Sequence, residues 1–280
     1  MYMNIFWDGI EPDSLADYIE LYLLVTKAKL SKSDILSFVQ NNEQVSEEDV
    51  DVAFSQLDNR LKHYYPFIPF STNNNILVSA DDISLKTHSE YAMCLLFSLN
   101  GAASQYEATH LFEDVVAESL RNHLGPHSKV KEIGRCRHLS GITKDIADFL
   151  STCALDKPCD TDNDGGVDII SAVTFLDEKH GKLTLLTDCA AGSLWENKKA
   201  IPLTKWEELF QWGKGRPVPS IAIPGIISNE HRKEKGKEYG IIIDRPRILK
   251  GLYLYSFRKE YGSIKDKVLS WCESELKKII

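Results

Sequence analysis

Two short β-rich runs, GVDII at 166–170 and KLTLLTD at 182–188, constrain the fold of this chain more than any other feature. Valine, isoleucine and threonine favour pleated, half-buried strands, and the polar stretch between the runs is typical of a turn. Each run carries one carboxylate, Asp168 or Asp188. Asp168 stands among apolar residues, where a charge has no packing reason to lie. The pattern predicts two neighbouring strands that bring two acids together.

Two carboxylates brought this close repel each other and share a proton unless a cation separates them. Mg²⁺ (or Mn²⁺) prefers oxygen ligands, so it suits Asp168, Asp188 and a backbone carbonyl, that of Cys189. Such an ion polarises a phosphate and lowers the pKa of a bound water. The two acids therefore predict a metal site suited to phosphodiester hydrolysis. The alternative is that Asp168 caps a strand end and Asp188 starts a turn.

A helix is expected over residues 107–125, because an apolar stripe repeats there at helical spacing and a Gly-Pro pair ends it. At about 100° per residue, Glu113 falls on the stripe with Leu120, whereas Glu118 falls on the solvent face. A buried acid is costly unless it is paired or bound to metal, so Glu113 is a candidate to orient a metal-bound water or a second ion. The alternative places Glu113 at the margin of the stripe, with its carboxylate reaching solvent.

The expected order is this helix, a short strand at 130–134, a helical insert, the strand with Asp168, the strand with Asp188, and a further helix. In that order residues 105–215 resemble the PD-(D/E)xK nuclease superfamily. Its restriction-endonuclease-like core carries a glutamate on the first helix, an aspartate on the second strand and an acid-x-lysine on the third. The resemblance therefore assigns those places to Glu113, Asp168 and Asp188.

The resemblance implies a Mg²⁺-dependent endonuclease that acts on DNA, in a host-defence or repair setting. Glu113, Asp168 and Asp188 would be catalytic and would also be the metal ligands. The expected fold class is α/β, with a restriction-endonuclease-like mixed-sheet core and an N-terminal helical region.

The match to this family departs at the lysine, because the residue two positions after Asp188 is Ala190. Some members carry the lysine on the following helix, and SLWENKK offers Lys198 and Lys199 there. A helix that starts at 192–193 would put Trp195 one turn before Lys198, where its ring can hold the lysine stem. Lys198 is therefore the candidate that stabilises charge on the phosphate. Without such a lysine, the chain would be an inactive nuclease-like scaffold in a multi-protein complex, which is the alternative function.

Charge is distributed unevenly along the 280 residues, whose overall net charge is −8. Residues 1–105 contain 15 acids and 6 bases, and the remainder contains 26 acids and 27 bases. Because phosphate backbones are bound by lysine and arginine, the acidic part is a poor nucleic-acid surface. We expect residues 1–104 to bind a protein partner or to self-associate, and residues 105–280 to form the nuclease-like domain that binds DNA.

The acidic part is expected to be helical. Helical spacing starts after Ser14, a second short helix follows Ser33, and a third begins at Ser46, whose acidic successors suit a helix N-terminus. Three helices followed by the strand ILV at 76–78 predict a winged-helix-like arrangement. That arrangement often binds DNA, but the acidity here favours protein binding or a structural use. A further buried helix is expected at 89–100, before a boundary at 101–104.

Membrane association and secretion are not expected. No apolar run approaches the roughly 20 residues of a membrane span, and the N-terminus lacks the pattern of a signal peptide, so we expect a cytoplasmic protein. The six cysteines include no CxxC pair. A zinc site could be built from Cys136, His138, Cys153 and Cys159, but buried reduced thiols fit the spacing better.

Basic residues gather near the C-terminal end of the sequence. Arg245, Arg247 and Lys250 follow an apolar strand, and more bases lie in the stretch 232–237 before it. Fixed arginines suit phosphates, whereas the glutamates interspersed there favour a solvated connector.

Overall fold

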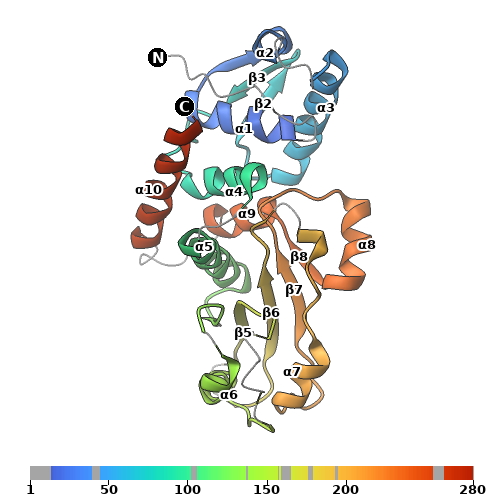
Figure 1. Cartoon of the computed structure of the whole chain (residues 1–280), viewed down its shortest axis with the longest axis vertical. Coiled ribbons are helices and arrows are strands. Elements are labelled where there is room, and N and C mark those ends of the chain that lie inside the picture. Colours follow the sequence, from blue (N-terminus) through green and yellow to red (C-terminus); the bar gives the residue numbers. More distant parts are fainter. Residues whose placement is uncertain are drawn as a thin grey trace. The chain divides into compact units, whose positions relative to one another are not determined.

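The computed structural model describes residues 14–39, 45–101, 106–136, 138–156, 158, 165–175, 179–192, 195–254 and 262–279. The chain divides into two compact units, one of Met1–Ala103 with Glu260–Ile280 and one of Ser104–Lys259. Both units are mixed α/β (Figure 1). The division falls within the boundary predicted at 101–104, whose last three residues lie outside the described part of the chain.

The first unit contains five helices among the described residues and a small sheet. Its elements are α1 (Leu15–Thr26), β1 (Lys29–Ser31), α2 (Lys32–Val39), α3 (Glu47–Tyr64), β2 (Phe70–Asn73), β3 (Ile76–Ser79), α4 (Ser89–Asn100) and α10 (Gly262–Ile279). The three strands are antiparallel in the order β1-β3-β2. The predicted start of α3 is confirmed by a capping box, in which Ser46 Oγ accepts from the Asp49 N–H and the Asp49 carboxylate accepts from the Ser46 N–H.

Helix α10 belongs to the first unit, whereas the charge pattern groups it with residues 105–280. The Trp271 ring stacks on Phe97 of α4 with centroids 4.9 Å apart. Cys272 is fully buried, and its thiol donates to the carbonyl oxygen of Ser89. The sequence pattern does not predict this contact, because α10 packs on residues of α4 such as Ser89, which lies 183 positions before Cys272 in the chain.

A buried hydroxyl–carboxylate network lies inside the first unit. Glu20 of α1 is 1% exposed, and its carboxylate accepts hydrogen bonds from Arg60 at 2.7 Å and from the Tyr64 hydroxyl at 2.7 Å. Tyr91 of α4 donates to the same carboxylate oxygen as Tyr64. A buried charge is tolerated here because several donors compensate for its lost hydration.

The second unit is built on a five-stranded mixed sheet. Its elements are α5 (Tyr106–Leu124), β4 (Ser128–Glu132), η2 (Leu139–Gly141), α6 (Thr143–Leu150), β5 (Ile169–Val173), β6 (Leu183–Cys189), η3 (Trp195–Asn197), α7 (Leu203–Leu209), β7 (Val218–Ala222), α8 (Asn229–Tyr239), β8 (Ile241–Ile243) and α9 (Arg245–Leu254). The strands follow the order β4-β5-β6-β7-β8. Strands β4, β5 and β6 are antiparallel, and β6, β7 and β8 are parallel. The two strands predicted to carry the acids are therefore neighbours.

Helices cover both faces of this sheet. Ile170 and Leu186 pack with Trp206 of α7 and with apolar residues of α6 in one core cluster. Because side chains alternate along a strand, the other face is left to α5, which contacts β4, β5 and α9. Ser119 of α5 donates to the carbonyl of Ile248 on α9 at 2.9 Å, so these two helices are in close contact.

The prediction for Glu118 is wrong. It was expected on the solvent face of α5, but it is 4% exposed and pairs with Arg121 one turn later. A single apolar stripe predicts one buried face, whereas α5 packs against the sheet and also against α9.

Among the described residues, no helix is long and apolar enough to cross a membrane.

Candidate active site

The ladder between β5 and β6 brings the two predicted acids to the same end of neighbouring strands. The ladder ends with Ile169 paired to Thr187, and Asp168 and Asp188 are the adjacent residues of the two segments at that end. Asp168 directly precedes β5, and its backbone is held on both sides. Its N–H donates to Thr187 O at 2.9 Å, and its carbonyl accepts from Ile133 N–H at 2.7 Å. The Asp168 carboxylate also accepts from the Cys189 N–H at 2.6 Å.

The Asp168 carboxyl is largely buried and lies near two other acids. Burial raises its pKa to about 8, and the negative charges of Asp188 and Glu113 act in the same direction. The Cys189 N–H and Lys198 oppose the rise without cancelling it. Asp168 therefore takes up a proton far more readily than an ordinary aspartate.

Glu113 reaches the same place from the middle of α5, and it is 6% exposed. Burial raises its pKa, and the hydrogen bond with His110 opposes that rise. The backbone of Gly134 lies between the two acids: a Cβ atom there would be 2.6 Å from Asp168 Oδ1 and 3.1 Å from Glu113 Oε2. A larger residue at this position would force at least the Asp168 carboxylate to shift.

His110 is a neighbour of the site that the sequence did not single out. Its Nδ1 lies 3.0 Å from Glu113 Oε2, one helical turn earlier on α5. The i,i+3 spacing of His110 and Glu113 indicates that the two side chains can meet on one helix face. It points to the site only when Glu113 is known to be buried there.

The prediction of an α-helix that starts at 192–193 is wrong. Residues 193–194 lie outside the described part of the chain, and the next element is η3, a single 3₁₀ turn at Trp195–Asn197. It is closed by the Lys198 N–H donating to Trp195 O at 3.0 Å. The Trp195 ring packs against Tyr239 and His231 of α8, with centroids 5.9 and 6.2 Å away.

Lys198 nevertheless reaches the acids from this turn. Its Nζ donates to Asp188 Oδ1 at 2.5 Å and to the Cys189 carbonyl at 3.1 Å. Burial works against its charge, but the Coulombic attraction and the hydrogen bond of Asp188 outweigh that effect and raise the pKa of Lys198. The lysine side chain is 42% exposed and that of Asp188 is 12% exposed, so the pair lies at the edge of the buried site. Lys199 is exposed beside it.

The other sequence candidates lie elsewhere. Among the described residues, no group of three or more His, Cys, Asp and Glu has a metal-holding arrangement. This holds for Glu113, Asp168 and Asp188 as well as for Cys136, His138 and Cys153 of the considered zinc site, whereas Cys159 lies outside the described residues.

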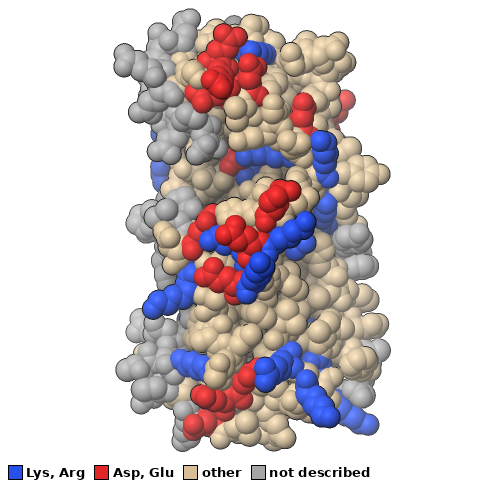
Figure 2. All heavy atoms as spheres, turned by 90° about the vertical axis from the view of Figure 1, so that its right-hand side faces the viewer, with Lys and Arg blue, Asp and Glu red and all other residues tan. Residues whose placement is uncertain are grey.

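The basic stretch before β8 is the helix α8 rather than a loop. Arg245 is fully buried and its Nε donates to the Pro224 carbonyl at 2.9 Å, so it is not available to a phosphate. Arg232 pairs with the buried Asp244. Figure 2, which faces the α8 side of the molecule, shows acidic and basic side chains interleaved rather than a continuous basic patch.

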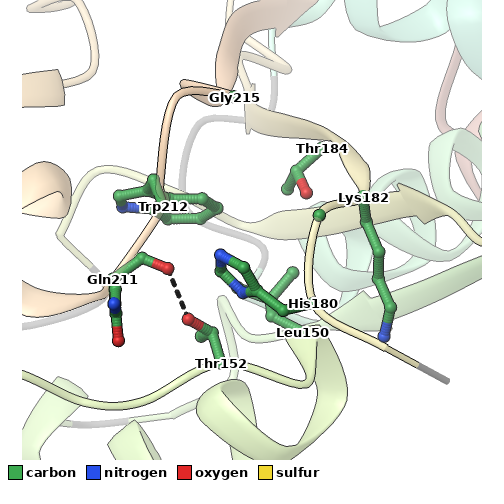
Figure 3. A pocket seen from close by; sticks show the side chains of 9 residues that line it. Leu150, Thr152, His180, Lys182, Thr184, Gln211, Trp212 and Gly215 are labelled. Carbon is green, nitrogen blue, oxygen red and sulfur yellow. Dashed lines mark hydrogen bonds between the residues drawn. The ribbon is translucent and has the colours of Figure 1, made fainter.

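A small pocket lies at the far end of β6 from the acids. Its volume is about 10 Å³, and Leu150, Thr152, His180, Thr184 and Trp212 are among the residues around it (Figure 3). Thr184 is near the start of β6, and Asp188 is near its end. A space of this size holds about one water, so the pocket is not a substrate site.

The arrangement thus brings four ionisable side chains together from α5, the residue before β5, β6 and the turn after η3. No family model matches this chain, and no curated protein or solved structure matches it significantly.

Proposed function

We propose that this protein is a metal-dependent nuclease that hydrolyses phosphodiester bonds of DNA. The observation that carries the proposal is the position of Lys198, whose ammonium bonds to Asp188 while Asp168 and Glu113 lie beside them. A lysine next to clustered carboxylates joins the two requirements of phosphoryl transfer, which are an oxygen-rich cation site and a positive donor for the phosphate.

The element order supports a restriction-endonuclease-like core. Helix α5 precedes three antiparallel strands, β4, β5 and β6, and α7 comes after them. This is the order of the superfamily that the sequence resembles, and the acids lie on the helix, directly before the second strand and on the third strand. The order and the antiparallel pairing support the proposed fold independently of the motif.

The donor set fits Mg²⁺ or Mn²⁺. Asp168, Asp188 and the Cys189 carbonyl are hard oxygen donors, and burial, followed by the negative charges of Asp188 and Glu113, raises the pKa of Asp168. A divalent cation would offset the negative charges. With few protein ligands, such an ion would keep several waters. When bound, it would polarise the scissile phosphate and acidify a water.

The side chains around the metal site would then divide the remaining work. Lys198, charged and at the edge of the buried site, would donate to a non-bridging phosphate oxygen. Glu113, held by His110, would orient the attacking water. Cys189 N–H keeps Asp168 directed toward Asp188.

The alternative function is an inactive nuclease-like scaffold. Ala190 at the superfamily's lysine position favours it, as does the acidic first unit. For that unit we infer a winged-helix-like arrangement, supported by the element order α1-β1-α2-α3-β2-β3, and a role in binding a protein partner or a second copy. A host-defence setting rests on the resemblance alone.

Nicking of supercoiled plasmid, together with cleavage of single-stranded DNA, branched DNA and RNA, tests the proposal. The wild type should cut DNA with Mg²⁺ or Mn²⁺, and Asp188→Ala should cut at least ~100-fold more slowly. Asp145→Asn changes an exposed acid on α6 and serves as the matched control. Equal rates for wild type and Asp188→Ala would overturn the site. A wild type that cuts nothing, also in the presence of its partner, would favour the scaffold.

A further inference from the structure

The last residue of α8 holds the turn that carries Lys198. Tyr239 is 3% exposed, and its hydroxyl lies 2.9 Å from Glu196 O and 2.8 Å from Lys198 O. A phenol has one proton, so it donates to one of these carbonyls at a time or is shared between them. The two carbonyls flank the backbone from which the Lys198 side chain extends. This hydroxyl therefore ties that backbone to α8, in addition to the Lys198 N–H bond that closes η3.

Two further contacts join α8 to the same turn. The Glu196 carboxylate lies 3.3 Å from Lys235 Nζ and 3.6 Å from His231 Nε2. The Trp195 ring packs against Tyr239 and belongs to the core cluster that includes Ile221 of β7. These two contacts are half-exposed or apolar, and neither acts on the backbone of Lys198. The hydroxyl of Tyr239 is the contact that does.

Tyr239 is in turn fixed to the sheet that carries Asp188. Gly240 comes next with φ of +77°, and a Cβ atom there would overlap Pro219 O on β7. Only glycine permits this close approach of α8 to the sheet. Strand β8 then pairs with β7, and β7 pairs with β6 through Ile221 opposite Asp188. Asp188 and Tyr239 are thus parts of one hydrogen-bonded framework, and Lys198 spans the gap between them.

We propose that Tyr239 is a positioning residue for the nuclease site, because its hydroxyl sets where the Lys198 ammonium stands relative to Asp188. The catalytic consequence rests on the proposed function, but the positioning itself does not. Loss of the hydroxyl should leave the fold and the ring packing in place and loosen the turn.

The geometric part is tested with Tyr239→Phe in the full chain, without substrate. Hydrogen exchange in a peptide that spans 195–200 should quicken, because the Lys198 N–H closes η3. Acylation of Lys198 by an amine reagent at one fixed pH should be several-fold faster, as measured by peptide mass spectrometry. Tyr64→Phe is the matched control, since it removes a buried hydroxyl in the first unit. Unchanged exchange and labelling in a folded Tyr239→Phe would overturn the proposal.

Glu196→Gln provides a second variant in case Tyr239→Phe folds poorly. It weakens the contacts with Lys235 and His231 and leaves both carbonyls bonded to the hydroxyl. Lys198 labelling should then stay close to the wild-type rate. Labelling that quickens as much as expected for Tyr239→Phe would show that the charge contacts, and not the hydroxyl, position the lysine.

The catalytic part is tested by a double-mutant cycle. Tyr239→Phe should lower the single-turnover rate about tenfold with little change in DNA affinity, since a misplaced catalytic group costs rate. In a Lys198→Met background the same change should have no further effect. An equal loss in both backgrounds would show that Tyr239 acts elsewhere. If the wild type cuts nothing, the proposed function fails, while exchange and labelling still decide whether Tyr239 positions Lys198.

Discussion

The backbone N–H of Cys189 donates to the carboxylate of Asp168 across 2.6 Å, so the strand that carries one acid also orients the other. Burial and, after it, the negative charge of Asp188 raise the pKa of Asp168. The two acids therefore behave as one unit in both electrostatics and stability, and a change at one of them should be felt at the other.

Asp168→Asn should stabilise the metal-free protein above neutral pH. The pKa of Asp168 is about 8 in the folded chain against an ordinary value of 3.8, so between these values the folded state binds more protons than the unfolded state. Stability must then fall as pH rises through this window. Asparagine keeps an acceptor for Cys189 N–H and removes the titration. Melting in chelator at pH 5, 7 and 9 should show a flatter pH dependence and a gain of a few degrees at pH 9.

Added Mg²⁺ should reverse the order of these two proteins. A ligand that binds only the folded state raises its melting temperature, so wild type should gain and Asp168→Asn should not. If the variant melted lower than wild type at pH 9 in chelator, the raised pKa of Asp168 would be contradicted.

Lys198→Met should lower the cleavage rate at least ~100-fold with little loss of DNA binding. Methionine keeps an apolar stem and removes the ammonium that bonds to Asp188. Lys199→Met is the internal control, because that neighbour is exposed. Single-turnover rates and DNA anisotropy separate chemistry from binding. Equal cleavage by Lys198→Met and wild type would remove the lysine from the proposed site.

Gly134→Ala should damage the site more than the fold. The added methyl group would lie 2.6 Å from Asp168 Oδ1 and 3.1 Å from Glu113 Oε2, so the two carboxylates must move apart. We expect at least a ~10-fold loss of rate and a smaller Mg²⁺-induced rise in melting temperature. Gly141→Ala, where an added Cβ meets nothing within 4 Å, is the matched control. Wild-type metal response in Gly134→Ala would contradict the convergence of these acids.

The second unit, Ser104–Lys259, should keep most of the DNA affinity at low salt when produced alone. The deleted residues include more acids than bases, and phosphate binding needs lysine and arginine. A fragment that starts at 104 and runs to the C-terminus would give a different result. It keeps α10 but lacks the α4 residues that bury Cys272. That longer fragment should aggregate more readily. A folded Ser104–Lys259 fragment without DNA affinity at about 50 mM salt would place the DNA surface in the first unit.

Local pattern predicted the elements whose own residues determine them. The run at 182–188 became β6, the apolar stripe after residue 106 became α5, and Ser46 caps α3. In each case propensity, periodicity and capping agree over a short stretch, so no distant contact is needed. The run at 166–170 matches β5 only in its last two residues, so Asp168 lies just before the strand rather than on it.

Features that depend on distant partners were not predictable in the same way. Residues 229–239 have no apolar periodicity, yet they form α8, capped by Ser228 and packed through Tyr239 on the turn at Lys198. The short distance in sequence between Asp188 and Lys198 predicts their contact, but it does not predict that Lys198 extends from a 3₁₀ turn. The space at Gly134 and the second covered face of α5 are set by tertiary packing, which no local window contains.

The inclusion of α10 in the first unit has a consequence for synthesis. The site-bearing unit is inserted between α4 and α10, so its residues all leave the ribosome before the first unit has its last helix. Chains emerge N-terminus first at roughly 5–20 residues per second, and a unit that lacks one helix exposes apolar surface meanwhile. The inserted unit can therefore complete its fold first, and the first unit, although it begins the chain, closes only when α10 arrives to cover Phe97.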